Sequence, residues 1–559
     1  MEQEQNKIDK RVSEWLKDRN NLIFLMIFLF GISIRLYYFF ITKSQPLWWD
    51  EADYMSYAKG LAGVDTHWII TDQHNSLFPY IASVFFRVGF SEGAIKLFLE
   101  VLPSILLIFL IYKILIMMYK DKRIALISSF LMAVFWENLF NSFRFHLESL
   151  ALLFSFLAIY VFWKGYERKE KIFSKINPKW SVLITVFLVM VVYSIRRGFF
   201  LLGFFFLAYM ILTKNMKELI KDKYNWISLA SAFLLFLLIE NSVFLSKIYN
   251  VAGSYYSSDK IPFNLIPFQI FGIYFNNLSN NFFSVLTYLF WIGFVILIFH
   301  LFLGIGFFRK EETSKFSLRP DLFSFLTIII TLSYFLFFTR MSPETGIGDP
   351  RWYYLLLPGA FICISKASLL ITDYIQKYSK ILSVVFLILL IGFGGYYELQ
   401  HADMIIKSKI PSFEGIKEAS LFIKENSNPD DILVTISTSQ ASYYAEREII
   451  DPRLSLSGSL SPNITLDEFI SVLKKHEKAR YLIITFSEPN YPSWMRQEEY
   501  IQDPNTGQVM FSKWKLPFLG VEIDFTNNQQ KATEEVTYNS VKFKLVGVFS
   551  DAFVYEIFT

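Results

Sequence analysis

Cysteine is almost absent from this sequence, and histidine is scarce. The single cysteine, Cys363, lies inside an apolar run, so neither a disulfide framework nor a cysteine metal site is available. The six histidines show no ligand spacing, which argues against a structural zinc site. The net charge is only +4 over 559 residues. The sequence therefore offers no general surface for a polyanion such as nucleic acid.

Hydrophobic residues are abundant instead. They make up 53% of the chain, which contains 61 Phe and 31 Tyr, a composition typical of a membrane protein. Many apolar runs are long enough to cross a hydrocarbon core of about 30 Å. They lie at 21–41, 94–118, 124–141, 147–163, 180–195, 198–213, 225–246, 283–308, 321–339, 353–372 and 381–397.

Lysine and arginine indicate the side of the membrane on which each connection lies. Residues 1–20 are polar and basic, which places the N-terminus in the cytoplasm. Cation-rich connections alternate with cation-poor ones, and this alternation fits about eleven spans. We therefore expect a multi-pass protein of the plasma (cytoplasmic) membrane, with residues 398–559 outside the cell.

One short apolar segment decides that count. Leu77 to Phe90 spans about fourteen residues and contains Pro79 and Arg87, which is short for a span. Counting it as a span would reverse every later connection, so we interpret it as an amphipathic helix on the outer surface. A long first outer loop, residues 42–93, then belongs to a transmembrane domain of residues 1–397.

The composition changes after Tyr397. Residues 398–559 contain no spanning run and alternate between helical and strand patterns. The sequence predicts helices at 413–425 and 466–476, and strands at 431–437, 479–485 and 541–557. This alternation is typical of a soluble α/β domain.

Charged residues gather on the connections assigned to the outer face. Charges near a membrane tend to mark functional sites, and we expect the acids and arginines of these loops to share one pocket. The members of this set are Asp50, Glu51, Asp53, Asp72, His74, Arg144, His146, Glu148, Arg196, Arg197, Asp349 and Arg351. The alternative for each residue alone is a side chain that reaches water at the membrane interface.

This combination suits the transfer of a group from a phosphate. A carboxylate can accept the proton of an attacking hydroxyl, and guanidinium groups bind phosphate bidentately. A phosphate leaving group needs little protonation, so the site requires a base and cations more than an acid and a nucleophile. The alternative is a transporter or flippase of a lipid-linked anion, which predicts inward-facing charges and interrupted spans.

The order of these features resembles a known group of enzymes. After the basic N-terminus and one span come Asp50-Glu51 with Tyr54, a surface helix, a span opening at Ala94-Ile95-Lys96, the loop Lys120-Asp121-Lys122-Arg123, Glu148 and Arg197-Gly198. This order resembles the GT-C membrane glycosyltransferases that use polyprenyl-phosphate sugars, namely the lipid A aminoarabinose transferases and the protein O-mannosyltransferases. The resemblance covers residues 20–215 and weakens afterwards, apart from the segment 349–353.

The resemblance implies roles for the matching residues. Asp50 is the candidate catalytic base, with Glu51 beside it, and Glu148 stands where relatives have a second carboxylate. The candidates for the donor phosphate are Arg196, Arg197, Arg351 and His74, although Asn75-Ser76 follow His74 where relatives have Pro-Pro. The candidate substrate-binding residues are Trp49, Tyr54 and Tyr353.

The resemblance therefore implies an inverting glycosyltransferase. It would move a monosaccharide from a dolichyl or undecaprenyl phosphate carrier to an acceptor hydroxyl on a protein, glycan or lipid at the outer membrane face. Asp50 and Asp53 could hold a divalent cation, but the arginines can neutralise the phosphate, so we expect no metal and no other cofactor. In oligosaccharyltransferases a Trp-Trp-Asp motif lies in the soluble domain, so we interpret Trp48-Trp49-Asp50 in this first loop as an accidental match.

Overall fold

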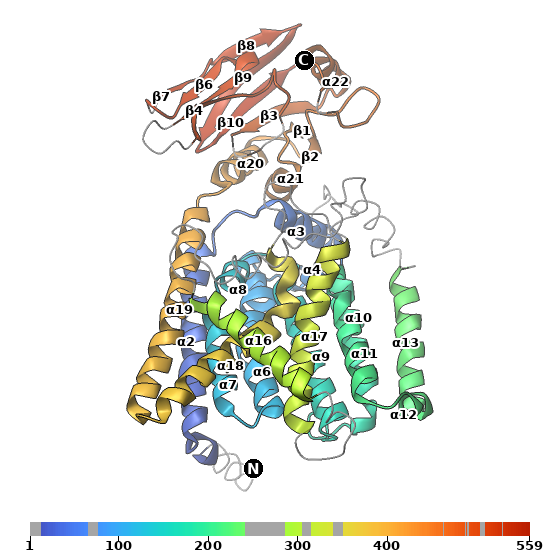
Figure 1. Ribbon diagram of the computed structural model, residues 1–559. Coiled ribbons are helices and arrows are strands. Elements are labelled where there is room, and N and C mark those ends of the chain that lie inside the picture. The colour runs from blue at the N-terminus through green and yellow to red at the C-terminus, as the bar shows by residue number, and fades with distance from the viewer. Residues whose placement is uncertain are drawn as a thin grey trace. The chain divides into compact units, whose positions relative to one another are not determined.

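The computed structural model describes residues 13–64, 76–240, 285–304, 315–338, 350–461, 463–486, 488, 491–502, 509–527 and 529–559. Contacts divide the chain into two compact units (Figure 1). The helical unit comprises Met1–Lys43, Asn75–Phe78 and Ser91–Ser408. The mixed unit comprises Ser44–His74, Pro79–Phe90 and Lys409–Thr559.

The helical unit consists of apolar helices and short helical turns. They are α2 (Arg19–Thr42), α5 (Glu92–Lys96), η1 (Leu97–Val101), α6 (Leu102–Met118), α7 (Lys122–Val134), α8 (Trp136–Asn141), α9 (Leu147–Phe162), η2 (Trp163–Glu167), η3 (Pro178–Trp180), α10 (Ser181–Ile195), η4 (Arg197–Phe200), α11 (Leu201–Thr213), α12 (Met216–Lys221), α13 (Lys223–Glu240), α16 (Val285–Gly304), α17 (Lys315–Phe338), η7 (Pro350–Leu356), α18 (Leu357–Gln376) and α19 (Lys380–Lys409). Within the described ranges, eight helices are long and apolar enough to cross a membrane. The predicted polytopic α-helical membrane protein is confirmed, and the count of eleven spans stays a prediction.

The apolar run at 124–141 forms two helices rather than one. The helix α7 ends at Val134, and α8 begins at Trp136. The fully buried Arg35 of α2 donates hydrogen bonds to the carbonyls of Met132 (3.2 Å) and Ala133 (3.0 Å). These carbonyls belong to the last turn of α7, where no later amide can reach them. The Arg35 guanidinium of α2 therefore supplies the hydrogen-bond donors that the last carbonyls of α7 lack.

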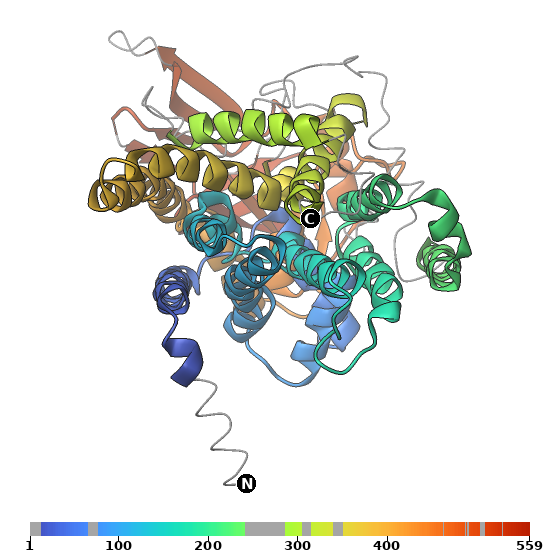
Figure 2. The ribbon, with the colours of Figure 1, turned by 60° about the horizontal axis from the view of Figure 1, so that its bottom comes forward.

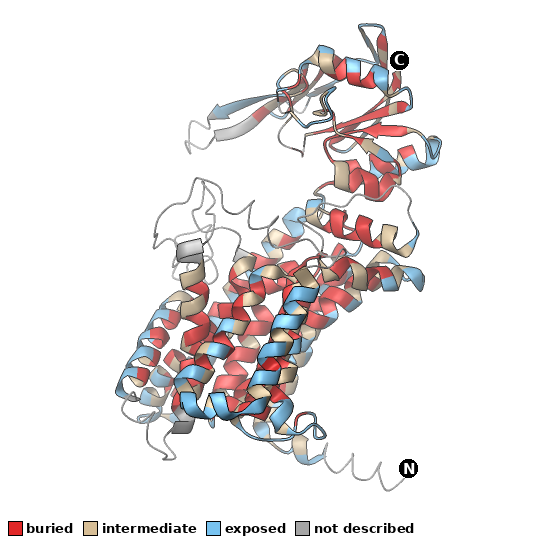
Figure 3. Ribbon diagram, turned by 90° about the vertical axis from the view of Figure 1, so that its right-hand side faces the viewer, coloured by how far each residue is buried: buried red, intermediate tan, exposed pale blue. Residues whose placement is uncertain are grey.

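Side chains in the helical unit differ widely in burial. Ribbon segments coloured as buried and as exposed both occur among its helices (Figure 3). Most side chains of α18 are buried, whereas Ser228 is the buried residue of α13. The helix α13 stands at the rim of the bundle, beside α10 and α11 (Figures 1 and 2).

The mixed unit contains two β-sheets. The first has the strand order β2-β1-β3-β10-β9-β8, and the second has the order β4-β5-β6-β7. The strands are β1 (Ile432–Val434), β2 (Glu448–Ile450), β3 (Ala479–Thr485), β4 (Gln497–Gln502), β5 (Val509–Leu516), β6 (Val521–Asp524), β7 (Gln529–Lys531), β8 (Glu535–Tyr538), β9 (Val541–Phe549) and β10 (Ala552–Phe558). The strands β2, β1 and β3 are parallel, and the later strands pair antiparallel.

Apolar side chains are buried on both faces of the six-stranded sheet. Along β3, Tyr481 and Ile483 pack with α20 (Glu414–Asn426) and α21 (Thr438–Ala445). Leu482 and Ile484 pack on the other face with α22 (Leu466–Lys475) and the second sheet. Alternate residues of a strand point to opposite faces, which explains the continuous apolar run of this strand. The predicted α/β domain is confirmed.

The first loop contributes two helices to the mixed unit. They are α3 (Trp49–Ala62) and most of α4 (Leu77–Arg87). The helix α3 packs against α21. The sequence analysis assigned this loop to the transmembrane domain, whereas its contacts group it with the residues after 408.

Candidate active site

Glu148 lies in the first turn of α9, which begins at Leu147. Its side chain is 1% exposed, and its Oε1 atom lies 3.1 Å from Arg196 Nη2 and 3.9 Å from Arg351 Nε. Arg196 follows the last residue of α10, and Arg351 lies in η7. Three of the predicted site residues therefore come together from three elements of the helical unit.

This cluster contains two cations and one anion. The side chains of Arg196 and Arg351 are 21% and 20% exposed, so both keep access to solvent. Guanidinium groups stay charged and bind phosphate bidentately. Glu148 thus lies next to two guanidinium groups, whose chemistry suits an anionic ligand.

Arg197 has a different partner from its neighbour Arg196. Its Nη1 atom lies 2.5 Å from Glu240 Oε1, and the Tyr193 hydroxyl donates to the same oxygen at 2.5 Å. Glu240 is the last residue of α13. The sequence analysis did not single out this glutamate, although an acid inside the predicted span at 225–246 was a signal that could have revealed it.

A buried hydrogen-bond network connects α8, η7 and the turn before α9. The Asn141 amide donates to the Tyr354 hydroxyl (2.7 Å), and that hydroxyl donates to the Glu137 carbonyl (3.0 Å). The Asn141 side-chain oxygen lies 2.6 Å from His146 Nδ1. His146 directly precedes the helix that carries Glu148, and Tyr354 lies one turn from Arg351. The network therefore holds both ends of the Glu148–Arg351 pair in place.

The predicted catalytic carboxylates of the first loop lie on α3. Asp50 and Glu51 occupy its first turn, where acids also stabilise the positive end of the helix dipole. Glu51 and Asp53 are 2% and 6% exposed, whereas Asp50 is half-buried. Asp50 is thus the most accessible carboxylate of the three.

The other predicted residues have varied environments. Tyr54 and Tyr353 are buried, at 4% and 0% exposure. The Trp49 indole is partly exposed and donates its N–H to Glu488 Oε1 at 2.7 Å. His74, like Asp72 and Asp349, lies outside the described residues.

Ligands for a metal ion would have to come from acidic, histidine or cysteine side chains. Within the part of the chain that the structure describes, no three of them are grouped so that they could hold an ion. A divalent cation at Asp50 and Asp53 therefore gains no support from a third ligand among these residues.

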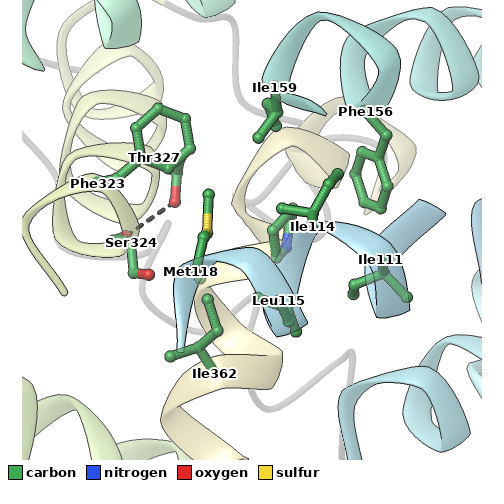
Figure 4. Close-up of a pocket in the computed structure, with 12 residues that line it drawn as sticks. Ile111, Ile114, Leu115, Met118, Phe156, Ile159, Phe323, Ser324, Thr327 and Ile362 are labelled. Atoms are coloured by element: carbon green, nitrogen blue, oxygen red, sulfur yellow. Dashed lines mark hydrogen bonds between the residues drawn. The ribbon is translucent and has the colours of Figure 1, made fainter. Parts of the chain in front are cut away.

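An apolar cavity of about 560 Å³ lies between α10, α11, α12 and α13. Its lining includes Val186, Phe206, Met210, Trp226 and Phe236, together with Tyr193, whose hydroxyl contacts Glu240. The cavity therefore reaches the residues that precede Arg196 and Arg197. A second cavity, between α6, α9, α17 and α18, measures only about 10 Å³ (Figure 4), which is room for about one water molecule.

Comparisons with known proteins agree on one architecture. A family model described as dolichyl-phosphate-mannose-protein mannosyltransferase matches residues 73–239. The oligosaccharyltransferase of Archaeoglobus fulgidus, in complex with Zn and sulfate, aligns over 92% of this chain and 75% of its own, with a TM-score of 0.59 and 12% identity. ArnT from Cupriavidus metallidurans, bound to undecaprenyl phosphate, aligns over 94% of this chain and 97% of its own, with a TM-score of 0.55 and 11% identity. None of the curated proteins matches the chain by sequence.

The chain has the GT-C fold of membrane glycosyltransferases. The resemblance inferred from the order of motifs is thereby confirmed at the level of the fold.

The segment matched by the family model includes most of the cluster described above. Residues 73–239 contain Glu148, Arg196 and Arg197, as well as the residues that line the apolar cavity. Arg351 and Asp50 lie outside that segment. A further GT-C structure, AglB from Archaeoglobus fulgidus in complex with an inhibitory peptide and a dolichol-phosphate, aligns over 93% of this chain and 77% of its own, with a TM-score of 0.57 and 12% identity.

Proposed function

We propose that this protein is an inverting glycosyltransferase that uses a polyprenyl-phosphate sugar as its donor. The observation that carries the proposal is that Arg196 and Arg351 both lie next to Glu148, in the same unit as an apolar cavity of about 560 Å³. A polyprenyl-phosphate carrier has the matching chemistry, because its phosphate needs cations and its hydrocarbon tail needs an apolar surface.

The known structures support this donor class. ArnT is bound to undecaprenyl phosphate, and AglB is in complex with a dolichol-phosphate. The chain matches nearly the full length of ArnT but only about three quarters of the oligosaccharyltransferase. We propose that the enzyme transfers a single sugar to a hydroxyl group on a protein, a glycan or a lipid.

The proposed reaction is a single displacement at the anomeric carbon. The acceptor hydroxyl oxygen attacks this carbon, its proton passes to the carboxylate of Asp50, and the bond between carbon and phosphate oxygen breaks. The polyprenyl phosphate leaves with the electron pair of that bond, and the arginines stabilise its charge. One displacement inverts the configuration of the sugar.

The proposed site lies at the outer face of the plasma membrane. The basic flank before α2 supports a cytoplasmic N-terminus, and the alternation of cation-rich and cation-poor connections supports an extracytoplasmic location of residues 398–559. Labelling of cysteines introduced at exposed residues of β8, in intact cells, tests this orientation.

Two measurements on the purified full chain test the function. Mass spectrometry of the lipid that co-purifies should detect a polyprenyl phosphate. Incubation with polyprenyl-phosphate sugars of different head groups should release free polyprenyl phosphate in step with a glycosylated acceptor. Passage of the intact sugar lipid across vesicle membranes without cleavage would instead identify a transporter and overturn the proposal.

A further inference from the structure

The helix α3, which carries Asp50, is attached to the C-terminal part of the mixed unit at both ends. At its start, the Trp49 indole N–H donates to Glu488 Oε1 at 2.7 Å. At its end, Lys59 Nζ donates to the Tyr443 carbonyl and to Glu446 Oε1, each at 3.1 Å. The fixed orientation of this helix therefore depends on residues about four hundred positions later in the chain.

Aromatic packing reinforces the first attachment. The rings of Trp48 and Trp49 contact the Phe413 ring edge to face, with centroids 5.7 and 5.0 Å away. Phe413 has a positive φ of 66°, a conformation that is strained for a bulky residue. Such strain persists only where the surroundings enforce it, and it is often found at functional sites.

Glu488 reaches Trp49 because of the parallel strands in the sheet. The strands β1 and β3 are parallel, so their carboxyl ends lie at the same edge. Ser437 follows β1, Glu488 follows β3, and the Ser437 hydroxyl donates to Glu488 Oε1 at 3.1 Å. The Arg496 guanidinium donates to the Glu488 carbonyl. Trp49 and Ser437 therefore hold the Glu488 carboxylate, and Arg496 holds its backbone carbonyl.

A carboxylate at this position is energetically unfavourable for the fold. Glu488 is 5% exposed, and burial raises its pKa, even though hydrogen bonds from Trp49 and Ser437 and the charges of Arg453 and Arg496 oppose that rise. An apolar side chain would fill this space without the cost of burying a polar group. Packing alone therefore does not account for a buried hydrogen-bond acceptor here, whereas the bonds from Trp49 and Ser437 do.

We infer that Glu488 is a positioning residue for Asp50, because it holds Trp49 and thereby fixes the first turn of α3. The inference rests on the proposed function, in which Asp50 is the base. A displacement of a reacting group by about 1 Å can cost about a hundredfold in rate. Loss of the Trp49–Glu488 hydrogen bond should therefore reduce kcat more than it changes KM for the donor.

Substitutions on both sides of the hydrogen bond test the inference. Glu488→Ala and Trp49→Phe should each reduce kcat at least tenfold, with KM for the polyprenyl-phosphate sugar unchanged within about twofold. The double variant should be no slower than the slower single variant, because both remove the same interaction. Glu488→Gln keeps an oxygen acceptor for the indole and should retain most of the activity.

A matched control lies in the same unit. Glu522 of β6 pairs with Lys513 at 3.1 Å, away from α3, and Glu522→Gln should leave kcat unchanged. If Glu488→Ala is poorly folded by thermal unfolding, Trp49→Phe decides the matter: a loss of kcat of at least tenfold with a wild-type unfolding temperature supports the inference, and full activity overturns it. Full activity of both Trp49→Phe and Glu488→Ala, or strictly additive losses in the double variant, would overturn the inference.

Asp50→Asn separates this inference from the proposed function. If Asp50→Asn is inactive while the Trp49 and Glu488 variants are fully active, the positioning role is wrong and the base assignment stands. If Asp50→Asn remains active, the base assignment itself is wrong.

Discussion

Arg35 and Arg351 both belong to the helical unit, but they have opposite environments. Arg35 is fully buried and donates to Ser104 and to the carbonyls of Met132 and Ala133. The Arg351 side chain is 20% exposed and lies beside Glu148. A guanidinium whose donors are directed at the protein's own backbone stabilises the fold, whereas one that keeps access to solvent can bind a ligand. Charge inside an apolar sequence is therefore an incomplete signal of function.

The same contrast applies to the two ends of one helical run. Glu148 begins α9 and contacts two arginines, and Glu167 ends η2 and pairs with Arg319 at 2.6 Å. At 1.5 Å per residue these two glutamates lie roughly 28 Å apart. We expect the end where Arg196 and Arg351 both approach Glu148 to bind the anionic substrate, and the Glu167–Arg319 pair to stabilise the fold.

The largest effect is expected for Asp50→Asn. The amide has nearly the same shape but cannot accept the acceptor's proton at neutral pH, so transfer should fall by about 10²- to 10⁴-fold. Binding of the carrier lipid, measured by native mass spectrometry, should be unchanged. Loss of lipid binding together with loss of activity would mean that Asp50 supports the fold rather than the chemistry.

The next largest effect is expected when the arginines beside Glu148, at the start of α9, are removed and the result is compared with removal of Arg319 beside Glu167, at the end of η2. Arg351→Ala and Arg196→Ala should each lower kcat/KM for the donor by about 10- to 100-fold, since each removes a charge-assisted contact with phosphate. Arg319→Ala is the matched control at the other end and should leave donor kinetics within about threefold. Equal losses of kcat/KM in all three variants would show that the arginines beside Glu148 have no special role in binding the donor.

Arg35→Leu should affect stability rather than kinetics. The substitution leaves two carbonyls of α7 without their donor in an apolar environment, which should cost about 3 kcal/mol. Thermal unfolding of the full chain in detergent should detect the loss, and Arg351→Ala should unfold close to the wild-type temperature. A wild-type unfolding temperature for Arg35→Leu would contradict the structural role.

The sequence was informative about fold class and less so about contacts. The strand at 479–485 and the helices near 413–425 and 466–476 are confirmed because their apolar periodicity reflects which faces are buried. The break at Phe135 was missed. Its polar groups bond to distant residues: the Trp136 amide donates to the Glu398 carboxylate, and Arg35 of another helix donates to the Met132 carbonyl. Hydropathy reports whether a segment is apolar, but not where a distant donor meets its backbone.

In the candidate site, too, the sequence predicted which residues matter better than which residues contact one another. Glu148, Arg196 and Arg351 are brought together as expected, but Arg197 pairs with Glu240, which was not singled out. Glu488 was missed because it lies in a soluble segment with no motif. Its importance comes from the parallel pairing of β1 and β3, which the sequence does not encode locally.

The smallest effect is expected for Glu446, which pairs with Lys59 in the last turn of α3. Burial tends to raise the pKa of Glu446, but hydrogen bonds and charges from Lys424 and Lys59 outweigh burial and hold that pKa below its ordinary value of 4.5. A lowered carboxyl pKa in the folded state contributes stability above pH 4.5 that is lost as the pH falls through the folded value. Glu446→Gln should therefore destabilise the full chain at pH 7 by a few tenths to about 1 kcal/mol.

The difference between wild type and Glu446→Gln should shrink as the pH falls below 4.5, because the wild-type carboxylate then becomes neutral as well. Glu535→Gln, which removes an exposed acid paired with Lys542, is the control and should show little difference at either pH. Thermal unfolding at pH 7 and at pH values below 4.5 measures both variants. A difference that stays constant with pH would mean that Glu446 stabilises α3 by packing rather than by its charge.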